Sequence, residues 1–480
     1  MKTKSLKTFS LVFASFIAGV FLSLQMPAFA DRAETSAGLP LEDLRLFAEV
    51  FNTIKQGYVE PVEDKKMIAN AISGMLSNLD PHSSYIDPES FKEFQISTQG
   101  EFGGLGIEVG MEDGLVRVVA PIEDTPAYRA GIKAGDLIFK LDDEPVKGQT
   151  LNDAVKKMRG KPNTSIRLSI LRQGEVKPLE ITLTREIIKV QSVKSKRLES
   201  GYAWVRITQF QENTLSLLAK HLQDIYKAGE IKGLVLDLRN DPGGFLHGAV
   251  GVSAAFLPQG VKIVSTDGRA PDSHQEFRAM TTDYMRGSGI SVDPLTSLPP
   301  VLKSVPMVVL VNGGSASASE IVAGALQDHK RAVIMGTQTF GKGSVQTIMP
   351  LPGNAAIKLT TARYYTPSGR SIQAKGIEPD IVVEESPNGD RVPLLREADL
   401  TGHLENDREA SAGKEKKKSG KDGKDAKDEK AETLSFPRLE YASDSDYQFQ
   451  QALNLLKGLN IVQKQGDAQA QGGRTETAEK

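Results

Sequence analysis

Apolar residues recur at helical spacing over the first part of the chain. Between residues 41 and 59 they fall on one face of a helix, at Leu41, Leu44, Phe47, Ala48 and Phe51. A second helix is predicted over residues 65–79, and Pro81 ends it. These elements predict a helical N-terminal region over residues 41–96, with apolar faces for packing or for association with another copy of the chain.

Shorter apolar runs, bounded by turn residues, follow over residues 97–186. Their length and alternation predict strands at 106–109, 115–119, 136–141, 165–171 and 177–184. One helical stretch, over residues 151–158, interrupts them. We therefore expect a compact β-rich domain in this part of the chain.

The longest segment, residues 195–385, alternates β-branched apolar runs with helical stretches. The predicted strands lie at 202–207, 233–238, 306–312, 331–336 and 357–365. Alternation of this kind predicts a layered α/β core, so the whole chain reads as a mixed α/β (α+β) protein with a β-rich domain inserted before the core.

The chain beyond the core changes character twice. Residues 404–433 are mostly Lys, Asp, Glu, Gly and Ala, which predicts a disordered charged linker. Apolar residues return over 446–459, so residues 434–463 are predicted to form a helical segment. The polar tail, residues 464–480, is predicted to be disordered.

The N-terminus has the pattern of a secretory signal. Three lysines, Lys2, Lys4 and Lys7, precede an apolar run over residues 9–24, and small residues at Ala28 and Ala30 form a cleavage site. An uncleaved anchor is the alternative, but this run is short of the roughly 20 residues that a spanning helix needs. We expect residues 1–30 to be a signal peptide and the mature chain to be exported to the periplasm, or held at the membrane if the segment stays.

Composition narrows the classes of function. A chain of 480 residues exceeds one ordinary core and predicts about two to four domains. The net charge of −2 gives no electrostatic reason for binding nucleic acid. Without cysteine there is no disulfide framework, thiol nucleophile or thiolate metal site, and we expect neither a metal ion nor another cofactor.

A glycine-rich turn opens the β-rich domain. Gly104-Leu105-Gly106-Ile107 leads into the first predicted strand, and such a turn leaves backbone N–H groups free to bind a carboxylate. The simpler interpretation is a turn that packs tightly. This turn, together with residues 130–136 further on, resembles the PDZ domain, which implies that Gly104, Leu105, Gly106 and Ile107 bind the C-terminus of a peptide added to the strand edge.

A strand, a tight turn and a helix follow one another in the core. The buried run 308–311 leads into a glycine- and serine-rich turn over 312–320, and an apolar helix begins there. A nucleophile at such a turn is exposed, and unpaired N–H groups of the first helical turn can hold an oxyanion. Ser315, Ser317 and Ser319 all compete for this role, or all three only cap the helix, and residue chemistry alone leaves this open.

A serine nucleophile needs a base. None of the six histidines forms an evident triad motif, and His329 stands at the predicted end of the helix, where a cap is the simpler role. Lys342, which lies between Gly341 and Gly343, is an alternative base if burial lowers its pKa.

Four stretches of the core, residues 236–244, 314–320, 341–346 and 376–380, resemble the carboxy-terminal processing peptidases, also called tail-specific proteases. With the PDZ-like segment before the core, the resemblance spans about residues 41–385. It implies a crotonase-like layered core and cleavage of protein substrates that have unstructured apolar C-terminal tails. A second copy of the chain and an adaptor protein are further candidate partners.

The resemblance also implies roles for individual residues. Ser317 is the nucleophile, Lys342 the general base, and Gln346 orients the lysine. The oxyanion donors are the N–H of Ala318 and that of Gly243 or Gly244.

Two acidic residues near the matching stretches, Asp328 and Asp241, are expected to have no catalytic role. Asp328 is expected to make a structural contact at the helix end. Asp241 stands where the family more often has Asn, with no effect expected on the backbone donors.

Three other functions compete with this interpretation. Residues 336–342 fit the phosphate-binding pattern G-x-x-x-x-G-K, but Gly343 replaces the hydroxyl residue that binds Mg²⁺, and a strand rather than a helix follows. A PDZ scaffold with an inactive core is the second rival. A crotonase-like hydratase is the third, and the export signal and the PDZ-like segment count against it, because acyl-CoA is cytosolic.

Overall fold

The computed structural model describes residues 40–475, apart from gaps at 100, 123–124, 173, 176, 190, 199–200, 287–291, 388–394 and 409–439. The predicted signal peptide lies outside the described residues. None of the helices within those limits combines the length and apolar character needed to cross a bilayer. The chain divides into two compact units, Met1–Ala71 and Ile72–Lys480.

The first unit contains the amphipathic helix α2 (Leu41–Gly57), close to its predicted range, and the start of α3 (Asp64–Ser77). α2 has no buried residue, and its apolar face stays about half exposed, as at Leu44, Phe47 and Val50. A 2.8 Å ion pair between Lys55 and Asp64 links the two helices within this unit. Because α2 buries nothing in the monomer, its apolar stripe has no partner within its own unit.

The second unit opens with the end of α3, the short strand β1 (Ser84–Ile86) and helix α4 (Pro88–Gln99). Asp87 caps α4, since its carboxylate accepts from the N–H groups of Glu89 and Ser90 at 3.0 and 3.1 Å. β1 pairs with a strand of the antiparallel sheet described below.

The β-rich domain is an antiparallel sheet in the order β3-β4-β5-β7-β8, with β6 (Glu144–Pro145) paired to β5. The strands are β3 (Ile107–Glu112), β4 (Leu115–Pro121), β5 (Leu137–Leu141), β7 (Ser165–Leu171) and β8 (Leu179–Thr184). Helices α5 (Pro126–Arg129) and α6 (Leu151–Met158) complete it, and a capping box between Thr150 and Asp153 starts α6 where the pattern predicts. All five predicted strands and the predicted helix are present.

Another strand pair in this domain was not predicted. β2 (Glu101–Gly104) pairs with β9 (Glu186–Lys189). Two of the four β2 residues are glycines, which are depleted in strands, so the local sequence hides the pairing.

A six-stranded sheet forms the centre of the core, in the order β10-β11-β12-β15-β16-β19. Its strands are β10 (Val193–Arg197), β11 (Tyr202–Ile207), β12 (Gly233–Asp237), β15 (Met307–Val311), β16 (Val333–Gly336) and β19 (Ile381–Val382). The strands β11, β12, β15, β16 and β19 run parallel to one another, and only β10 is antiparallel to its neighbour in this sheet. β12 and β15 are fully buried, as continuous apolar strands of a parallel sheet should be.

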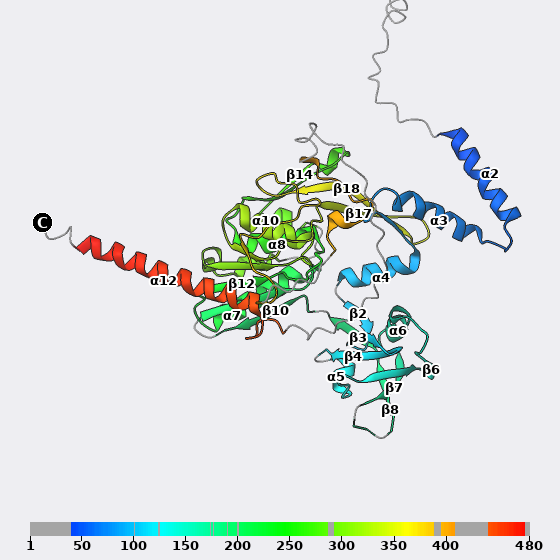
Figure 1. Cartoon of the computed structure of the whole chain (residues 1–480), viewed down its shortest axis with the longest axis horizontal. Coiled ribbons are helices and arrows are strands. Elements are labelled where there is room, and N and C mark those ends of the chain that lie inside the picture. Colours follow the sequence, from blue (N-terminus) through cyan, green and yellow to red (C-terminus); the bar gives the residue numbers. More distant parts are fainter. Residues whose placement is uncertain are drawn as a thin grey trace, which may run out of the picture. The chain divides into compact units, whose positions relative to one another are not determined.

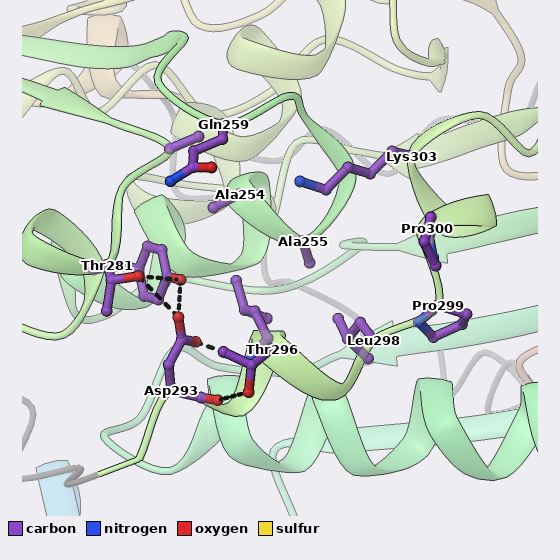
Figure 2. A pocket seen from close by; sticks show the side chains of 13 residues that line it. Ala254, Ala255, Gln259, Thr281, Asp293, Thr296, Leu298, Pro299, Pro300 and Lys303 are labelled. Carbon is purple, nitrogen blue, oxygen red and sulfur yellow. Dashed lines mark hydrogen bonds between the residues drawn. The ribbon is translucent and has the colours of Figure 1, made fainter.

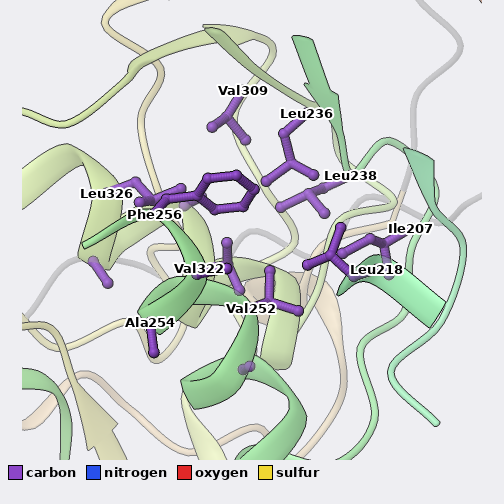
Figure 3. Packing of buried hydrophobic residues seen from close by; sticks show 14 of the residues in the cluster. Ile207, Leu218, Leu236, Leu238, Val252, Ala254, Phe256, Val309, Val322 and Leu326 are labelled. Atoms are coloured by element: carbon purple, nitrogen blue, oxygen red, sulfur yellow. The ribbon is translucent and has the colours of Figure 1, made fainter. Parts of the chain in front are cut away.

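Helices cover both faces of this sheet (Figure 1). One face packs on α7 (Thr214–Lys227), α8 (Leu246–Phe256) and α10 (Ala318–Asp328). Figure 3 shows this packing, with Leu236 and Val309 of the strands beside Phe256 of α8 and Val322 of α10. The other face packs on the C-terminal helix, so the core is a layered α/β structure.

A second, antiparallel sheet of five strands flanks the core. It contains β13 (Lys262–Asp267), β14 (Gln275–Arg278), β17 (Ser344–Pro350), β18 (Ala356–Tyr365) and β1. β18 is its centre, since it pairs with β1, β13 and β17. Short helical turns complete the core: α9 (Thr281–Tyr284), η2 (Pro271–Ser273), η3 (Pro294–Ser297), η4 (Pro300–Lys303) and η5 (Glu397–Asp399).

The C-terminal helix α12 (Tyr447–Thr475) is longer than predicted. The sequence predicted a disordered tail from residue 464, and for most of that segment this prediction is wrong. The helix continues to Thr475 although Gly466, Gly472 and Gly473 lower the helix propensity of this segment.

The predicted linker also needs a correction at its start. The Asp407 carboxylate accepts hydrogen bonds from Tyr365 and Ser371, at 2.6 and 3.0 Å, so residues 404–408 pack on the core. The rest of the predicted linker, and residues 434–439 of the predicted helical segment, lie outside the described residues.

A buried ion network fixes the C-terminal segment to the core. The guanidinium of Arg239, at the end of β12, donates to Asp237 and to both carboxylate oxygens of Asp446, at 2.6–2.9 Å. All three side chains are about 1% exposed or less. Although burial opposes it, the two carboxylates raise the pKa of Arg239 above its ordinary value. The ring of Tyr441 stacks over Arg206 nearby, with 3.5 Å from the guanidinium carbon to the ring centroid.

We predict that Asp446→Ala lowers the free energy of unfolding by about 3–5 kcal/mol, because it leaves a buried guanidinium with half of its carboxylate partners. Urea denaturation followed by circular dichroism measures this loss. Asp444→Ala, which removes an exposed carboxylate from the same turn, is the control and should leave stability unchanged. Equal stability of the two variants would contradict the proposed role of the network.

Candidate active site

Three loops meet at one edge of the parallel sheet. They follow β12, β15 and β16, which are neighbours in the sheet, and the carboxyl ends of parallel strands lie at the same edge. Contacts confirm that they meet. A Cβ added to Gly243, in the first loop, would lie 2.9 Å from the Cβ of Ser317 in the second. The N–H of Phe340, in the third loop, donates to the carbonyl of Ser315 at 3.1 Å.

Ser317 stands at the junction of its loop and α10, in a strained conformation. Its backbone has φ of 56° and ψ of −109°, outside the left-handed region that non-glycine residues sometimes adopt. Neighbouring bonds hold this geometry: the N–H of Ala316 donates to the carbonyl of Asp241 at 3.0 Å, and that of Ile321 to the carbonyl of Ser317 at 3.0 Å. Strain of this kind at a sharp strand-to-helix turn is typical of nucleophiles.

The three candidate serines differ in what their hydroxyls do. The hydroxyl of Ser315 donates to the carbonyl of Leu238 at 2.8 Å and accepts from the N–H of Asn312 at 3.0 Å. That of Ser319 donates to the carbonyl of Asp241 at 3.0 Å. Both residues are fully buried, whereas Ser317 is 8% exposed.

The hydroxyl of Ser317 instead contacts a side chain, the phenol of Tyr364. Burial raises the pKa of Tyr364 to about 12, so this neighbour stays neutral. The hydroxyls of Ser315 and Ser319 therefore donate to backbone carbonyls, whereas that of Ser317 interacts with a side chain.

The carboxylate of Glu320 joins the loop of Ser317 to the loop of Lys342. Its Oε2 accepts from the N–H of Ser317 at 2.7 Å and from that of Lys342 at 3.0 Å. Its Oε1 accepts from the hydroxyl of Thr339 at 2.6 Å and from the N–H of Gly341 at 2.7 Å. Two backbone segments far apart in the sequence are thus held against one carboxyl group.

Sequence reasoning assigned no role to Glu320, although a signal was present. Ser317 and Glu320 have the Ser-x-x-Glu spacing of a capping box just before an apolar helix. The side chain is completely buried, and burial raises its pKa to about 7 against the four hydrogen bonds that favour its charged form.

Lys342 lies in a setting that favours the neutral amine. Burial is the main cause that lowers its pKa below the ordinary 10.5, and the positive charge of Lys358 acts in the same direction. The carboxylates of Glu397, Glu320 and Asp80 oppose this shift. Lys342 was proposed as a base on condition that burial lowers its pKa, and the structure shows a shift in that direction.

One of those carboxylates is tied to the loop of Lys342. Glu397 accepts from Gln373 at 2.9 Å and pairs with His82 at 2.7 Å. The amide oxygen of Gln373 in turn accepts from the N–H of Gly343 at 3.1 Å. Polar groups from three distant segments therefore surround the loop that carries the lysine.

Gln346 lies on β17, which begins two residues after Lys342. A β-bulge brings Gln346 opposite Thr360 of β18. Its amide nitrogen donates to the hydroxyls of Ser344 and Thr360, at 2.9 and 3.3 Å. These bonds fix the side chain through β18.

The predicted oxyanion donors differ in availability. Gly243, with φ of +94°, comes so close to Ser317 and Ala318 that only glycine fits. Its N–H, however, donates to the carboxylate of Asp241 at 2.8 Å. The N–H groups of Ala318 and Gly244 have no hydrogen-bond acceptor among the described residues.

Asp241 engages one of these donors, as the amide oxygen of an asparagine at the same position also could. Its Oδ1 takes the N–H of Gly243, and its Oδ2 is buried without a hydrogen-bond partner in the described part of the chain. Burial raises the pKa of Asp241 to about 8. The side chain points back at its own loop because the turn places it two residues before Gly243.

Two other residues lie where their structural roles predict. Asp328, at the end of α10, accepts from the N–H of Ser368 at 2.9 Å. His329 follows it as the C-terminal cap, and its Nε2 lies 2.7 Å from the carbonyl of Lys262.

The glycine-rich turn of the β-rich domain has its carbonyls directed inward. Those of Leu105 and Gly106 accept from the N–H groups of Ala127 and Ile122, at 3.0 and 2.8 Å. Gly106 has φ of +77°, and a Cβ there would overlap Thr125 at 2.2 Å. The N–H groups of Leu105 and Gly106 have no acceptor among the residues that the structure describes. Gly104 ends β2 and Ile107 begins β3, which is an edge strand of its sheet.

A separate pocket of about 250 Å³ lies between α8, α9, η3 and η4 (Figure 2). Its polar centre is Asp293, whose carboxylate accepts from Tyr284 and Thr281 at 2.5 and 2.9 Å. None of the predicted site residues lines this pocket.

Three family patterns match consecutive parts of the chain. Peptidase family S41 matches residues 201–383, and the PDZ domain matches residues 103–183. The N-terminal domain of the activating protease CtpB matches residues 23–90.

Curated relatives match most of the chain. The carboxy-terminal-processing protease of Bartonella bacilliformis is 49% identical over 406 residues, which cover 83% of this chain and 89% of the relative. The carboxy-terminal processing protease CtpB of Bacillus subtilis is 35% identical over 363 residues, with 75% and 72% covered. A solved structure of the photosystem II D1 C-terminal processing protease is 28% identical, with a TM-score of 0.41, and the match covers 71% of this chain and 92% of that one.

We predict that Glu320→Gln destabilises the protein by about 1–3 kcal/mol. In its better orientation the new NH₂ group faces Thr339, whose hydroxyl can accept, and the N–H of Gly341, which is left unpaired, and an unpaired buried donor costs about 1–3 kcal/mol. Urea denaturation measures the change. Glu378→Gln, at an exposed position, is the control, and a Glu320→Gln protein as stable as this control would contradict the bridging role of Glu320.

Proposed function

This chain belongs to the carboxy-terminal processing peptidases, serine peptidases of family S41 that here carry a PDZ domain, and we propose that it is an exported endopeptidase using Ser317 and Lys342. The observation that carries the proposal is the shared carboxylate of Glu320, to which the N–H groups of both residues donate. The strained backbone of Ser317 and the lowered pKa of Lys342 support the same assignment.

The proposed reaction is acyl transfer. The neutral amine of Lys342 takes the proton of the Ser317 hydroxyl, and the serine oxygen attacks the scissile carbonyl carbon. Lys342, now an ammonium, then gives its proton to the leaving amine as the peptide bond breaks. Water, deprotonated by the same lysine, resolves the acyl-enzyme and restores Ser317.

The oxyanion is assigned to backbone donors that have no other acceptor. The N–H of Ala318, in the first turn of α10, lies at the positive end of the helix. The N–H of Gly244 is the second donor, because that of Gly243 is engaged by Asp241. Gly243 can serve in its place only after Asp241 releases it.

The PDZ domain is proposed to bind the C-terminal tail of a protein substrate. A peptide strand can add to β3, which has a free edge in the order of its sheet. The N–H groups of Leu105 and Gly106 would receive the terminal carboxylate. Half-buried apolar side chains on β3 and α6, Val109 and Val155 among them, would receive apolar tail residues.

Export and assembly are part of the proposal. The signal pattern of residues 1–30 supports export to the periplasm, and the exposed apolar face of α2 supports association with a second copy of the chain. An adaptor protein remains a candidate partner on the grounds of the family alone.

We predict that Ser317→Ala and Lys342→Arg each lower the rate of β-casein cleavage by at least about 10²-fold, because the first lacks the nucleophile and the second has a guanidinium that cannot act as a base. For the wild type, kcat/KM should rise with pH to a plateau, with a midpoint below 10.5, since only neutral Lys342 is active and burial lowers its pKa.

Gel electrophoresis of timed digests gives these rates. Lys358→Arg, which keeps the positive charge near the site, is the control for lysine replacement. Cleavage by Ser317→Ala at the wild-type rate would refute the assignment of the nucleophile and point to another residue, whereas a wild type that does not cleave would favour the scaffold.

A second prediction concerns the tail. A fluorescein-labelled peptide ending in Ala-Leu-Val with a free carboxylate should bind the Ser317→Ala protein at least about 10-fold more tightly than its C-terminal amide, because hydrogen bonds to a charged acceptor are lost in the amide. Fluorescence anisotropy measures both affinities. Equal binding of acid and amide would contradict carboxylate recognition by the turn at Leu105 and Gly106.

A further inference from the structure

A polar chain of contacts runs from the N-terminal side of β1 to β17, across the middle strand β18. Its members are Asp80, Ser83, Thr360 and Gln346. β1 pairs with β18 next to Thr360, through Ser84 and Lys358, and Thr360 is itself the cross-strand partner of Gln346. The contacts therefore link the segment before β1 to β18 and β17, and end four residues beyond Lys342.

Asp80 is the fixed end of this chain of contacts. Its side chain is buried, with 5% of the residue exposed. Oδ1 accepts from the N–H groups of His82 and Ser83, at 2.9 and 3.0 Å, and from the hydroxyl of Thr360 at 3.0 Å. Oδ2 accepts from the hydroxyl of Ser83 at 2.6 Å. Although burial opposes it, these bonds hold the pKa of Asp80 below its ordinary value, so the group is an ionised acceptor.

An ionised carboxylate decides the direction of the next hydrogen bond. Asp80 has no proton to give, so the single hydroxyl hydrogen of Thr360 must point to it. If that hydrogen turned toward Gln346, two oxygens would face each other 3.0 Å apart in a buried site. The oxygen of Thr360 is therefore left as an acceptor on the side of Gln346.

The same logic fixes the amide of Gln346. At 3.3 Å from Thr360 it must present its NH₂ group, which also donates to Ser344 at 2.9 Å. Ser344 alone would not decide the orientation, because its hydroxyl can donate or accept. With the nitrogen held by two hydroxyls, the amide oxygen lies on the opposite side of the group.

We propose that Asp80, acting through Thr360, is a positioning residue that fixes the Gln346 amide with its oxygen free to accept a hydrogen bond from the Lys342 amine. This inference rests on the proposed function of the Ser317–Lys342 pair. An amine that donates to Gln346 keeps its lone pair for the Ser317 proton. A flipped amide would instead offer an N–H to that lone pair and compete with the serine.

Two effects of Asp80 have to be separated. Its charge is one of those that act on Lys342, together with Glu397 and Glu320 in the same direction and Lys358 in the other. Thr360→Val removes the relay and leaves all four charges in place, whereas Asp80→Ala removes both relay and charge. The threonine variant is therefore the sharper test.

The experiment measures kcat and KM for β-casein cleavage across pH. Thr360→Val should lower kcat by roughly 10- to 100-fold with KM nearly unchanged, the scale expected when a catalytic group is misplaced. The acid limb of its pH profile should move to lower pH, because the Lys342 ammonium loses an acceptor. Thr360→Ser, which keeps the hydroxyl, should restore both quantities to near wild-type values.

Matched controls come from the same strands. Thr361→Val makes the same change at the next position of β18, where the hydroxyl contacts Thr347 instead, and should leave kcat unchanged. Asp80→Ala, which removes the acceptor of the Thr360 hydroxyl, should reproduce the loss of kcat, while Asp87→Ala, which removes a carboxylate that caps α4, should not. The Asp80 pair keeps the test decisive if Thr360→Val fails to fold.

The outcomes separate the two proposals. Wild-type kcat and pH profile in folded Thr360→Val and Asp80→Ala would overturn the positioning role while leaving the Ser317–Lys342 mechanism intact. Equal losses in Thr360→Val and Thr360→Ser would also overturn it, since packing rather than the hydroxyl would then matter. A wild-type protein that does not cleave, or a Ser317→Ala protein that does, would instead refute the proposed function and the positioning role with it.

Discussion

The buried carboxylate of Glu320 is the constraint on which the rest of the site depends. Its two oxygens accept four hydrogen bonds, and the donors come from the turn of Ser317 and from the loop of residues 339–342. These bonds compensate for the cost of burying a carboxyl group. They also hold two separate loops against the same side chain. A site built in this way is preorganised by the fold rather than by the substrate.

The turn at Ser317 is held in an unfavourable conformation by its surroundings. Its φ of 56° with ψ of −109° is costly for a serine, by about 1–3 kcal/mol for such residues in general. Packing against Gly243 and the bonds of Ala316 and Glu320 offset that cost. In the same crowded turn Asp241 accepts from the N–H of Gly243. The N–H groups of Ala318 and Gly244 have no acceptor among the described residues.

Support for the site extends far beyond the three loops. The C-terminal segment reaches the end of β12 through Arg239 and Asp446, and the segment before β1 reaches β17 through Asp80 and Thr360. Both are contributions from regions that flank the matched peptidase segment, residues 201–383. The core that positions the proposed nucleophile and base therefore includes chain from well outside that segment.

Local sequence was sufficient to predict many of the helices and strands of this protein and its candidate site residues. The periodicity of residues 151–158 predicted α6 to the residue, because a capping box and an amphipathic stretch are local signals. The family motifs singled out Ser317, Lys342 and Gln346, and the glycines near them showed where the backbone would approach closely. Only the tertiary structure decided how Asp80 and Asp446 are used, because their partners lie 280 and 207 residues away and no local pattern encodes such pairings. For Glu320 the Ser-x-x-Glu spacing is a local signal, but its bonds to residues 339–342 depend on the fold. The tertiary structure also showed which donor Asp241 engages: the sequence identifies a carboxylate, but whether that carboxylate accepts from a backbone N–H depends on the path of the loop in space.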